Sequence, residues 1–294
     1  MRVLLAVLLV GIAGCGGGSS PPAQTANADP VAALEKIGAT IKRNEPGEVV
    51  EVVLYGTRVT DSGLVHLKGM TKLQTLKLYK TKITDAGLLP LKGMTKLQTL
   101  NLYETKITDA GLVHLKGLTQ LQVLNLNDTQ ITDSGLLHLK GMTGLTGLNL
   151  GFTQITDSGL VHLKGMTKLE TLGLEHTRIS GVGLVHLKGL SKLQALNLSG
   201  TKDTGEGLVH LVGLPNLQLL YLNDPGIIDA GLGHLRGLTN LQHLYLSCYQ
   251  ITDAGLVHLK GLTKLQWLYL MGTKVTDAGV ADLKKSLPNC EISK

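Results

Sequence analysis

Apolar residues between positions 49 and 284 recur with a period of 24 residues and without an insertion. The period is marked by a block that reads ITDAGL in its commonest form. The first residue of this block falls at ten equally spaced positions: Val59, Ile83, Ile107, Ile131, Ile155, Ile179, Asp203, Ile227, Ile251 and Val275. Ten copies in phase predict one elongated repeat array rather than two ordinary globular domains.

The first part of each copy predicts a short strand. In the copy at residues 73–96, Leu76 and Leu78 alternate with polar or aromatic residues. This period of two is typical of a strand with one buried face. A polar turn at residues 80–82 separates the strand from the next apolar position.

The second part of each copy predicts a short helix. Leu88 and Leu91 have the spacing of one helical stripe. Thr84 and Asp85 are helix N-cap residue types, and Gly93 suits the end of a helix. We therefore expect the repeated Asp to cap these helices rather than to bind calcium.

The segment LQTLKLYKTKI at residues 73–83 resembles the L-x-x-L-x-L-x-x-N/C-x-L motif of the leucine-rich-repeat family. The ITDAGL continuation is similar to the subtype of F-box-associated and ribonuclease-inhibitor-like arrays, although no F-box motif is found ahead of the repeats. The chain departs from the family at the Asn/Cys position, where it carries threonine, whose hydroxyl can still bond the neighbouring backbone. These threonines are Thr57, Thr81, Thr105, Thr129, Thr153, Thr177, Thr201 and Thr273.

We therefore expect an α/β fold, a right-handed leucine-rich-repeat solenoid of about ten 24-residue repeats. Strands that return through a helix are parallel, with a right-handed crossover. Because strands stack about 4.8 Å apart and helices 8–10 Å apart, the stack bends into a horseshoe arc. A parallel sheet then lines the concave side, and the short helices lie on the convex side.

Both ends of the array, residues 49–284, are expected to carry caps. At the N-terminal side, residues 30–48 predict a short helix that starts at Pro30, followed by a hairpin around residues 44–47. At the other side, residues 285–294 close the array, and the apolar pattern there breaks the period by one residue.

The first 29 residues predict export and a membrane anchor. Residues 3–13 are an apolar run behind Arg2, too short for a comfortable membrane span, which is typical of a signal peptide. The sequence IAGC at residues 12–15 resembles the lipobox of bacterial lipoproteins. The resemblance implies cleavage after residue 14 and a lipid on Cys15, and Gly16 favours the outer membrane of the cell envelope. The alternative is a plain signal peptide with a nearby Cys. Residues 15–29 form a flexible tether.

Aromatic residues are few, and their positions are informative. The chain has seven Tyr, one Trp and one Phe. Eight of these nine fall on positions expected to face the concave side, and Tyr249 lies one residue further on. Exposed, aligned aromatic side chains are typical of binding surfaces. The eight are Tyr55, Tyr79, Tyr103, Phe152, Tyr221, Tyr245, Trp267 and Tyr269.

The tyrosines fall into two groups. Tyr55, Tyr79 and Tyr103 form one predicted column near the N-terminal end. Tyr221, Tyr245 and Tyr269 form another, and we expect His243, Trp267 and Cys248 on the concave side beside them. Tyr249, in place of the repeated Thr, is a further candidate ligand-binding residue next to this group. Each column either binds a ligand or only stacks across neighbouring strands. Trp267 and His243 favour a ligand surface for the second group.

Between the two groups lie polar and small residues: Asn101, Asn125, Asn149 and Asn197, the glycines Gly147, Gly151 and Gly173, and the acids Glu104, Asp128, Glu175 and Asp224. This mixture suits a protein, peptide or glycan partner. Two alternatives are a structural or assembly protein of the envelope, and an enzyme that uses the concave carboxylates. No P-loop, G-x-S-x-G or H-E-x-x-H motif is present, and we expect no enzyme and no cofactor.

Other repeated residues are better explained by the array itself. Eight histidines recur on the helices. We expect them to be consensus residues copied with the repeat rather than metal ligands, because side chains on parallel helices do not converge on one ion. They are His66, His114, His138, His162, His186, His210, His234 and His258. The net charge of +6 is spread along the chain, without a base-reading motif, so no nucleic-acid partner is expected.

Three copies break the pattern. Asp203 takes a position that is apolar elsewhere, and Pro225 and Tyr249 replace the repeated Thr in successive copies. Loosened loops beside aromatic residues are a common arrangement at binding sites, and neutral drift is the alternative. We expect no disulfide between Cys248 and Cys290, because their predicted positions lie about 23 Å apart along the strand direction.

Overall fold

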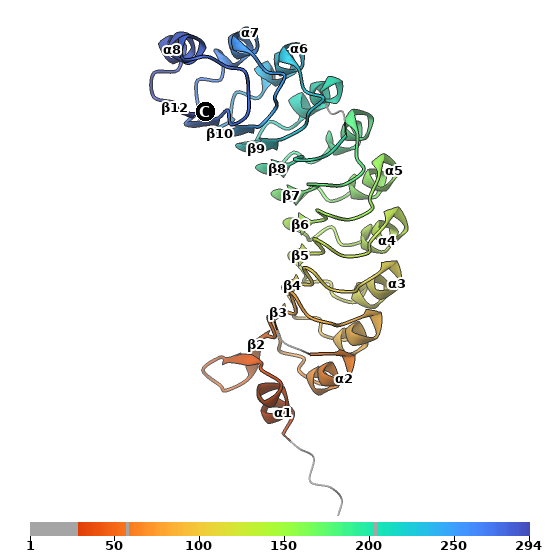
Figure 1. The fold of residues 1–294 in the computed structure, drawn as a ribbon. Helices are drawn as coiled ribbons and strands as arrows, with labels where there is room; N and C mark the ends of the chain where they lie inside the picture. The colour runs from red at the N-terminus through yellow and green to blue at the C-terminus, as the bar shows by residue number, and fades with distance from the viewer. Residues whose placement is uncertain (1–28, 57–58, 203–204) are drawn as a thin grey trace, which may run out of the picture.

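A computed structural model describes residues 29–56, 59–202 and 205–294. Its strands form one twelve-stranded sheet whose order follows the chain, and the sheet curves into an open arc (Figure 1). The strands are β1 Thr40–Arg43, β2 Val49–Val53, β3 Thr75–Lys77, β4 Thr99–Asn101, β5 Val123–Asn125, β6 Gly147–Asn149, β7 Thr171–Gly173, β8 Ala195–Asn197, β9 Leu219–Leu222, β10 His243–Leu246, β11 Trp267–Tyr269 and β12 Glu291–Ser293.

Short helical segments follow the strands and lie on the outer side of the arc (Figure 1). The α-helices are α1 Pro30–Lys36, α2 Asp61–Leu64, α3 Asp109–Leu112, α4 Asp133–Leu139, α5 Asp157–Leu160, α6 Asp229–Leu232, α7 Asp253–Leu256 and α8 Asp277–Ser286. The 3₁₀ segments are η1 Val65–Leu67, η2 Asp85–Leu91, η3 Val113–Leu115, η4 Val161–Leu163, η5 Gly181–Leu187, η6 Glu206–Gly213, η7 Gly233–Gly237 and η8 Val257–Leu259. The predicted solenoid, with a concave parallel sheet and a convex helical side, is confirmed.

The strand register follows the sequence period. From β2 to β12 every strand pairs in parallel with the next, as in the pairs Leu76–Leu100 and Leu100–Leu124. At the N-terminal side, β1 pairs antiparallel with β2 as the predicted hairpin, behind α1. At the other side, β12 keeps the register, with Ile292 opposite Leu268. The one-residue break in the apolar pattern therefore lies ahead of β12 and does not shift its register.

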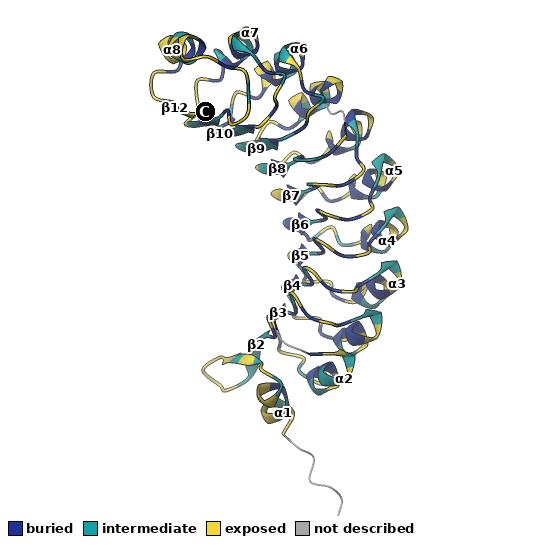
Figure 2. Cartoon of the chain, in the orientation of Figure 1, coloured by how far each residue is buried: buried dark blue, intermediate teal, exposed yellow. Residues whose placement is uncertain are grey.

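The interior is a ladder of aliphatic side chains, mostly leucine. The buried residues lie on the strands and on the helix sides that face them (Figure 2). Leu76, Leu100 and Leu124 occupy equivalent places and are fully buried or nearly so. Each buried leucine contributes about 1.5–3 kcal/mol. Within the part of the chain that the structure describes, no Phe, Tyr or Trp belongs to this core.

The repeated threonines secure the turn after each strand. Thr81 Oγ1 donates to the carbonyl oxygen of Leu78 at 2.6 Å, and six further threonines make the same bond. The residue before the threonine is left-handed, with a φ of 59° at Lys80. The expected bond between the Thr hydroxyl and the backbone is therefore confirmed.

The repeated aspartates join neighbouring repeats, and their expected role as helix caps is wrong. Asp85 Oδ1 accepts from the Thr108 backbone N–H at 2.8 Å, and Asp85 Oδ2 accepts from Thr108 Oγ1 at 2.6 Å. Thr108 itself is the cap, since its Oγ1 accepts from the Ala110 N–H at 3.3 Å. A Cβ on Gly111 would lie 2.4 Å from Asp85 Oδ1, so the glycine makes room for the carboxylate.

We call this arrangement the Asp–Thr tie. It recurs as Asp61–Thr84, Asp85–Thr108, Asp109–Thr132, Asp133–Thr156, Asp157–Ser180, Asp229–Thr252 and Asp253–Thr276. In the last tie, hydrogen bonds from Thr276 lower the pKa of Asp253. The series is interrupted where Gly181 and Gly205 replace the aspartate. There η5 and η6 approach closely, since a Cβ on Gly207 would lie 2.2 Å from Gly181 Cα.

The turns after β9 and β10 differ from the others. Asp224 and Cys248 take the position that is left-handed elsewhere, yet their side chains are buried. Cys248 Sγ donates to the Leu222 carbonyl oxygen at 3.1 Å, a bond that Pro225 cannot make because it has no hydroxyl. The prediction that Cys248 and Asp224 face the concave side is therefore wrong. Cys248 and Cys290 are both free and buried.

The predicted signal peptide, tether and lipid-attachment residue Cys15 lie outside the described residues, as do Thr57 and Asp203. Within the described residues, no helix is long and apolar enough to span a bilayer.

Candidate binding surface

The C-terminal aromatic stack is the largest aromatic cluster on the concave face. It consists of Tyr221, Tyr245 and Tyr269 with the neighbouring Trp267. Parallel pairing of β9, β10 and β11 places the three tyrosines side by side. The Tyr221 and Tyr245 rings lie 4.3 Å apart and the Tyr245 and Tyr269 rings 4.2 Å apart. The ring centroids of Trp267 and Tyr269 lie 6.3 Å apart, and the two ring planes are nearly parallel.

The C-terminal aromatic stack remains partly accessible. All four aromatic side chains are half-buried rather than buried. The neighbouring Tyr245 hydroxyl raises the pKa of Tyr269. His243 pairs with Trp267 across β10 and β11 and is half-buried as well. A stack of this kind offers a large, preordered contact area at little entropic cost.

The N-terminal group is less continuous than the sequence predicts. Tyr55 and Tyr79 stack, with ring centroids 4.3 Å apart. Tyr103 instead faces the Lys80 ammonium, which lies 5.7 Å from its ring centroid. The predicted column of three is thus a stacked pair followed by a cation–π contact. Lys80 also pairs with Glu104 at 3.7 Å, an exposed ion pair of small energy.

Tyr249 stands apart from the C-terminal aromatic stack. Its side chain is 56% exposed, and among the described residues it has no aromatic stacking partner. The buried position of its turn is taken by Cys248, which turns Tyr249 outward. The structure thus brings together Tyr221, His243, Tyr245, Trp267 and Tyr269, but not Tyr249.

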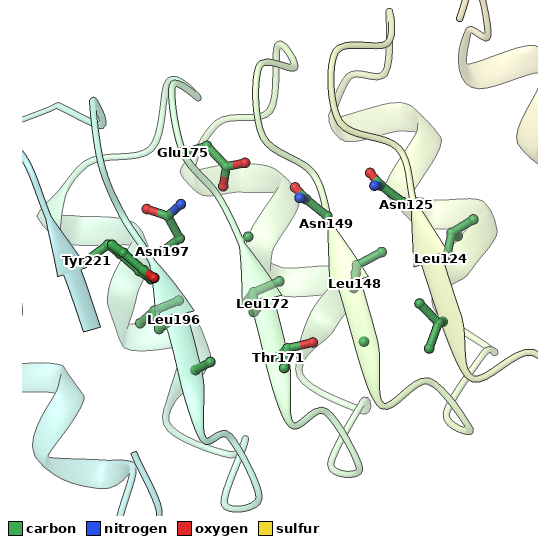
Figure 3. Close-up of a pocket in the computed structure, with 14 residues that line it drawn as sticks. Leu124, Asn125, Leu148, Asn149, Thr171, Leu172, Glu175, Leu196, Asn197 and Tyr221 are labelled. Carbon is green, nitrogen blue, oxygen red and sulfur yellow. The ribbon is translucent and has the colours of Figure 1, made fainter. Parts of the chain in front are cut away.

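Between the aromatic groups, the middle of the concave face is hollowed. The hollow, about 270 Å³, spans β5 to β9 (Figure 3). Small residues, Gly147, Gly173 and Ala195, take three of its outward strand positions. Asn125, Asn149, Asn197, Glu175 and Tyr221 surround it, and Tyr221 also belongs to the C-terminal aromatic stack. We call this feature the central hollow.

Sequence reasoning noted the asparagines and glycines of the central hollow but did not assign them a site. The signal that could have found it is the run of small residues at outward strand positions in successive repeats. A further contact was also missed. Phe152 and His176 lie in successive turns, and their rings are 4.4 Å apart. Both residues have a left-handed backbone, with φ angles of 53° and 51°.

In the part of the chain that the structure describes, no group of three or more His, Cys, Asp or Glu residues could hold a metal ion. The two described thiols are buried, and burial raises the pKa of each to about 11. What the middle of the concave face offers is aromatic area, amide groups and the partly buried carboxylate of Glu175.

Comparisons with known proteins agree with this architecture. A family model described as "Leucine rich repeat" matches residues 71–131, 167–227 and 215–275, and one described as "Leucine Rich repeats (2 copies)" matches residues 119–164. A comparison with curated proteins finds no match.

Solved structures of similar fold include internalin C2 from Listeria monocytogenes, at 27% identity and a TM-score of 0.53, over 75% of this chain and 92% of that one. Another is an internalin from the same organism, at 24% identity and a TM-score of 0.42, over 90% of this chain and 93% of that one. The first family model alone covers more than half of the sequence. The chain therefore belongs to the leucine-rich-repeat family.

Proposed function

We propose that this chain is a binding module that recognises a protein, peptide or glycan on its concave face. The observation that carries the proposal is the C-terminal aromatic stack, three stacked tyrosines with Trp267 outside the leucine core. Tyr and Trp dominate the energetics of known interfaces because they bury much area and order few torsions. Leucine-rich-repeat domains commonly bind proteins, which also supports binding rather than catalysis.

A binding screen of the full chain against envelope proteins and glycans would test this proposal. We expect Tyr245→Ala combined with Trp267→Ala to weaken capture of any partner by about tenfold or more. Tyr55→Ala is the matched control, since it removes a stacked tyrosine from the other end of the same face. Thermal unfolding of each variant confirms that it is folded. Capture unchanged in the double variant would contradict the proposal.

We further propose that the module is exported and held at the cell envelope by a lipid on Cys15. The lipobox-like IAGC at residues 12–15 and the apolar run before it support this. Several acyl chains on one residue would anchor the chain stably, where a single chain would not. The test is membrane fractionation of Cys15→Ala with mass analysis of the unaltered protein. Membrane retention of the variant, with no lipid mass on the unaltered chain, would refute it.

A second candidate function is assembly through the convex side. In eight of the ten repeats, the same position of the helical segment carries an exposed aliphatic residue on the convex side. These residues are Val65, Leu89, Val113, Leu137, Val161, Val185, Val209 and Val257. If Leu89→Lys and Leu137→Lys abolish partner capture while the concave double variant leaves it intact, assembly through the convex side replaces the concave-face proposal.

A further inference from the structure

We propose that the central hollow binds the cationic end of a lysine or arginine side chain of the partner, with Glu175 as its acceptor. This rests on the proposed function, since it names the chemistry that the concave face recognises. The hollow has a volume of about 270 Å³, below the roughly 300–1,000 Å³ of ordinary small-molecule clefts. That size suits the end of one side chain better than a whole metabolite.

The carboxylate of Glu175 is placed by a contact that spans two repeats. Asn127 Nδ2 donates to Glu175 Oε1 at 2.6 Å, across the intervening repeat. Gly151 occupies the equivalent position in that repeat, and a Cβ there would lie 2.3 Å from Glu175 Oε1. A Cβ on Gly173 would lie 3.0 Å from Glu175 Oε2 and 2.6 Å from Asn149 Oδ1. The two glycines are thus what allows the carboxylate to lie over the sheet.

The second carboxylate oxygen has no such contact. Glu175 Oε2 is buried, and no described residue donates a hydrogen bond to it. A buried acceptor without a donor is costly, more so when it carries charge. A ligand that brings a charged donor removes that cost, and charge-assisted hydrogen bonds are among the stronger ones in proteins.

Three amide groups that line the central hollow are held by backbone hydrogen bonds. The side-chain oxygens of Asn125, Asn149 and Asn197 each accept from a backbone N–H two residues later, at 2.9–3.0 Å. Their amino groups are the donors that remain, and Figure 3 shows the three amides and the Glu175 carboxylate on one face of neighbouring strands. A basic residue within a peptide matches this set, because its cation donates and its backbone carbonyls accept.

Charge on the concave face agrees with a cationic partner group. From β4 to β11, neither the strand residues nor the three residues after each strand include Lys or Arg. The net charge of +6 is therefore carried elsewhere. A partner cation that enters the central hollow meets the Glu175 carboxylate with no lysine or arginine in the strands that line it or in the three residues after each of them.

The experiment is a titration of the full chain with N-acetyl-arginine amide and with N-acetyl-citrulline amide, which has nearly the same shape without the charge. Binding is followed by NMR at the side-chain amides of Asn127, Asn149 and Asn197. We expect the arginine probe to bind about five- to tenfold more tightly than the citrulline probe. Equal binding of the two probes, or no arginine binding at 10 mM or thereabouts (about the weakest affinity such a contact gives), overturns the proposal.

Two variants assign the effect to the hollow. Glu175→Gln keeps an oxygen for Asn127 and should remove the preference for arginine, whereas Glu104→Gln, an exposed carboxylate on the same face, should keep it. Ala195→Leu fills the hollow without changing charge, and Leu219 shows that leucine is accommodated at this position one repeat later. We expect Ala195→Leu to weaken arginine binding as well. A preference that survives both Glu175→Gln and Ala195→Leu overturns the proposal.

The outcome is separable from that of the proposed function. If Tyr245→Ala with Trp267→Ala abolishes partner capture but Glu175→Gln leaves it unchanged, the aromatic surface stands and this inference falls. If the arginine preference depends on Glu175 while the aromatic double variant captures partners normally, the central hollow stands and the role of the C-terminal aromatic stack falls.

Discussion

The turns after β3 to β8 and the turns after β9 and β10 differ in the hydrogen bonds that hold them. In the first set a left-handed residue or glycine precedes a buried threonine, which donates to the carbonyl three residues earlier. In the second set Asp224 and Cys248 point inward, and Cys248 reaches the carbonyl of the preceding repeat. The comparison teaches that the Leu222 carbonyl keeps a side-chain hydrogen bond although Pro225 has replaced the consensus threonine.

The irregular turns are also compensated across repeats. Gln250 Nε2 donates to the Pro225 carbonyl at 2.6 Å, and the Ser247 N–H donates to Asn223 Oδ1 at 3.1 Å. β9 and β10 are each one residue longer than the strands between β3 and β8, with Leu246 opposite Leu222. Two tyrosines of the C-terminal aromatic stack, Tyr221 and Tyr245, lie on these strands. The turns that follow them are therefore held by hydrogen bonds that the regular repeats do not use.

The largest expected effect tests how far the regular repeats depend on their consensus bonds. Asp109→Ala removes both acceptors of one Asp–Thr tie and leaves the Thr132 N–H unpaired. Since bonds to a charged group contribute about 1.5–3 kcal/mol each, and this carboxylate is half-buried, we expect the free energy of unfolding to fall by about 3 kcal/mol. Urea unfolding measures the change.

Asp277→Ala is the matched control. Asp277 has the same place in its helix but makes an exposed ion pair with Lys294 instead of a tie. We expect a change within about 0.5 kcal/mol. Equal losses in the two variants would show that the tie contributes no more than an ordinary surface carboxylate.

A smaller effect compares the aromatic clusters at the two ends. Tyr245→Ala removes two stacking contacts and Tyr55→Ala removes one. Because each aromatic pair contributes about 0.5–1.5 kcal/mol, we expect losses of about 2 kcal/mol and about 1 kcal/mol. Chemical unfolding of both variants checks the ratio. A greater loss from Tyr55→Ala would mean that the C-terminal aromatic stack is not the more strongly held cluster.

The smallest expected effect concerns pH and the irregular turn after β10. Burial raises the pKa of the Cys248 thiol from its ordinary 9.0 to about 11. The unfolded chain therefore loses this proton first, so the contribution is fully present below pH 9 and is lost between pH 9 and pH 11. We expect a loss of about 1.4 kcal/mol at pH 10 from this thiol.

The measurement for this prediction is the free energy of unfolding from pH 8 to pH 11. Because lysines and tyrosines titrate in the same range, the unaltered chain is compared with Cys248→Ala. The variant should show the shallower decline above pH 9. Parallel curves for the two chains would show that Cys248 is not held as a buried neutral thiol.

The fold could be predicted almost entirely from the sequence, because ten repeats in succession show the same pattern of buried and exposed positions. Leu76 and its equivalents fix the buried strand face, and the period fixes the register. The role of the repeated aspartates could not be predicted in this way. Asp85 sits at a helix start, where a cap is the local expectation, and only the stacking of repeats brings Thr108 to its carboxylate.

The candidate surface was predicted in part. Parallel register alone places Tyr221, Tyr245 and Tyr269 together, so their stacking follows from sequence position. The inward turn of Cys248 depends on a carbonyl left open by Pro225 one repeat earlier, which a pattern within one repeat does not reveal. The contact between Glu175 and Asn127 spans two repeats, and it needs Gly151 between them.

The constant spacing of the Asp–Thr tie also determines which changes in the number of repeats the array can accept. Every tie leaves one repeat from an aspartate and ends on the same two atoms of a Thr or Ser 23 residues later. Suppose that one repeat length of sequence is duplicated or lost between Asp61 and Asp157. Each Thr or Ser donor would then still lie 23 residues after an equivalent Asp acceptor, so the ties would form again. The junction around Gly181 and Gly205 has no tie to reconnect, so recombination there would not find matching ends.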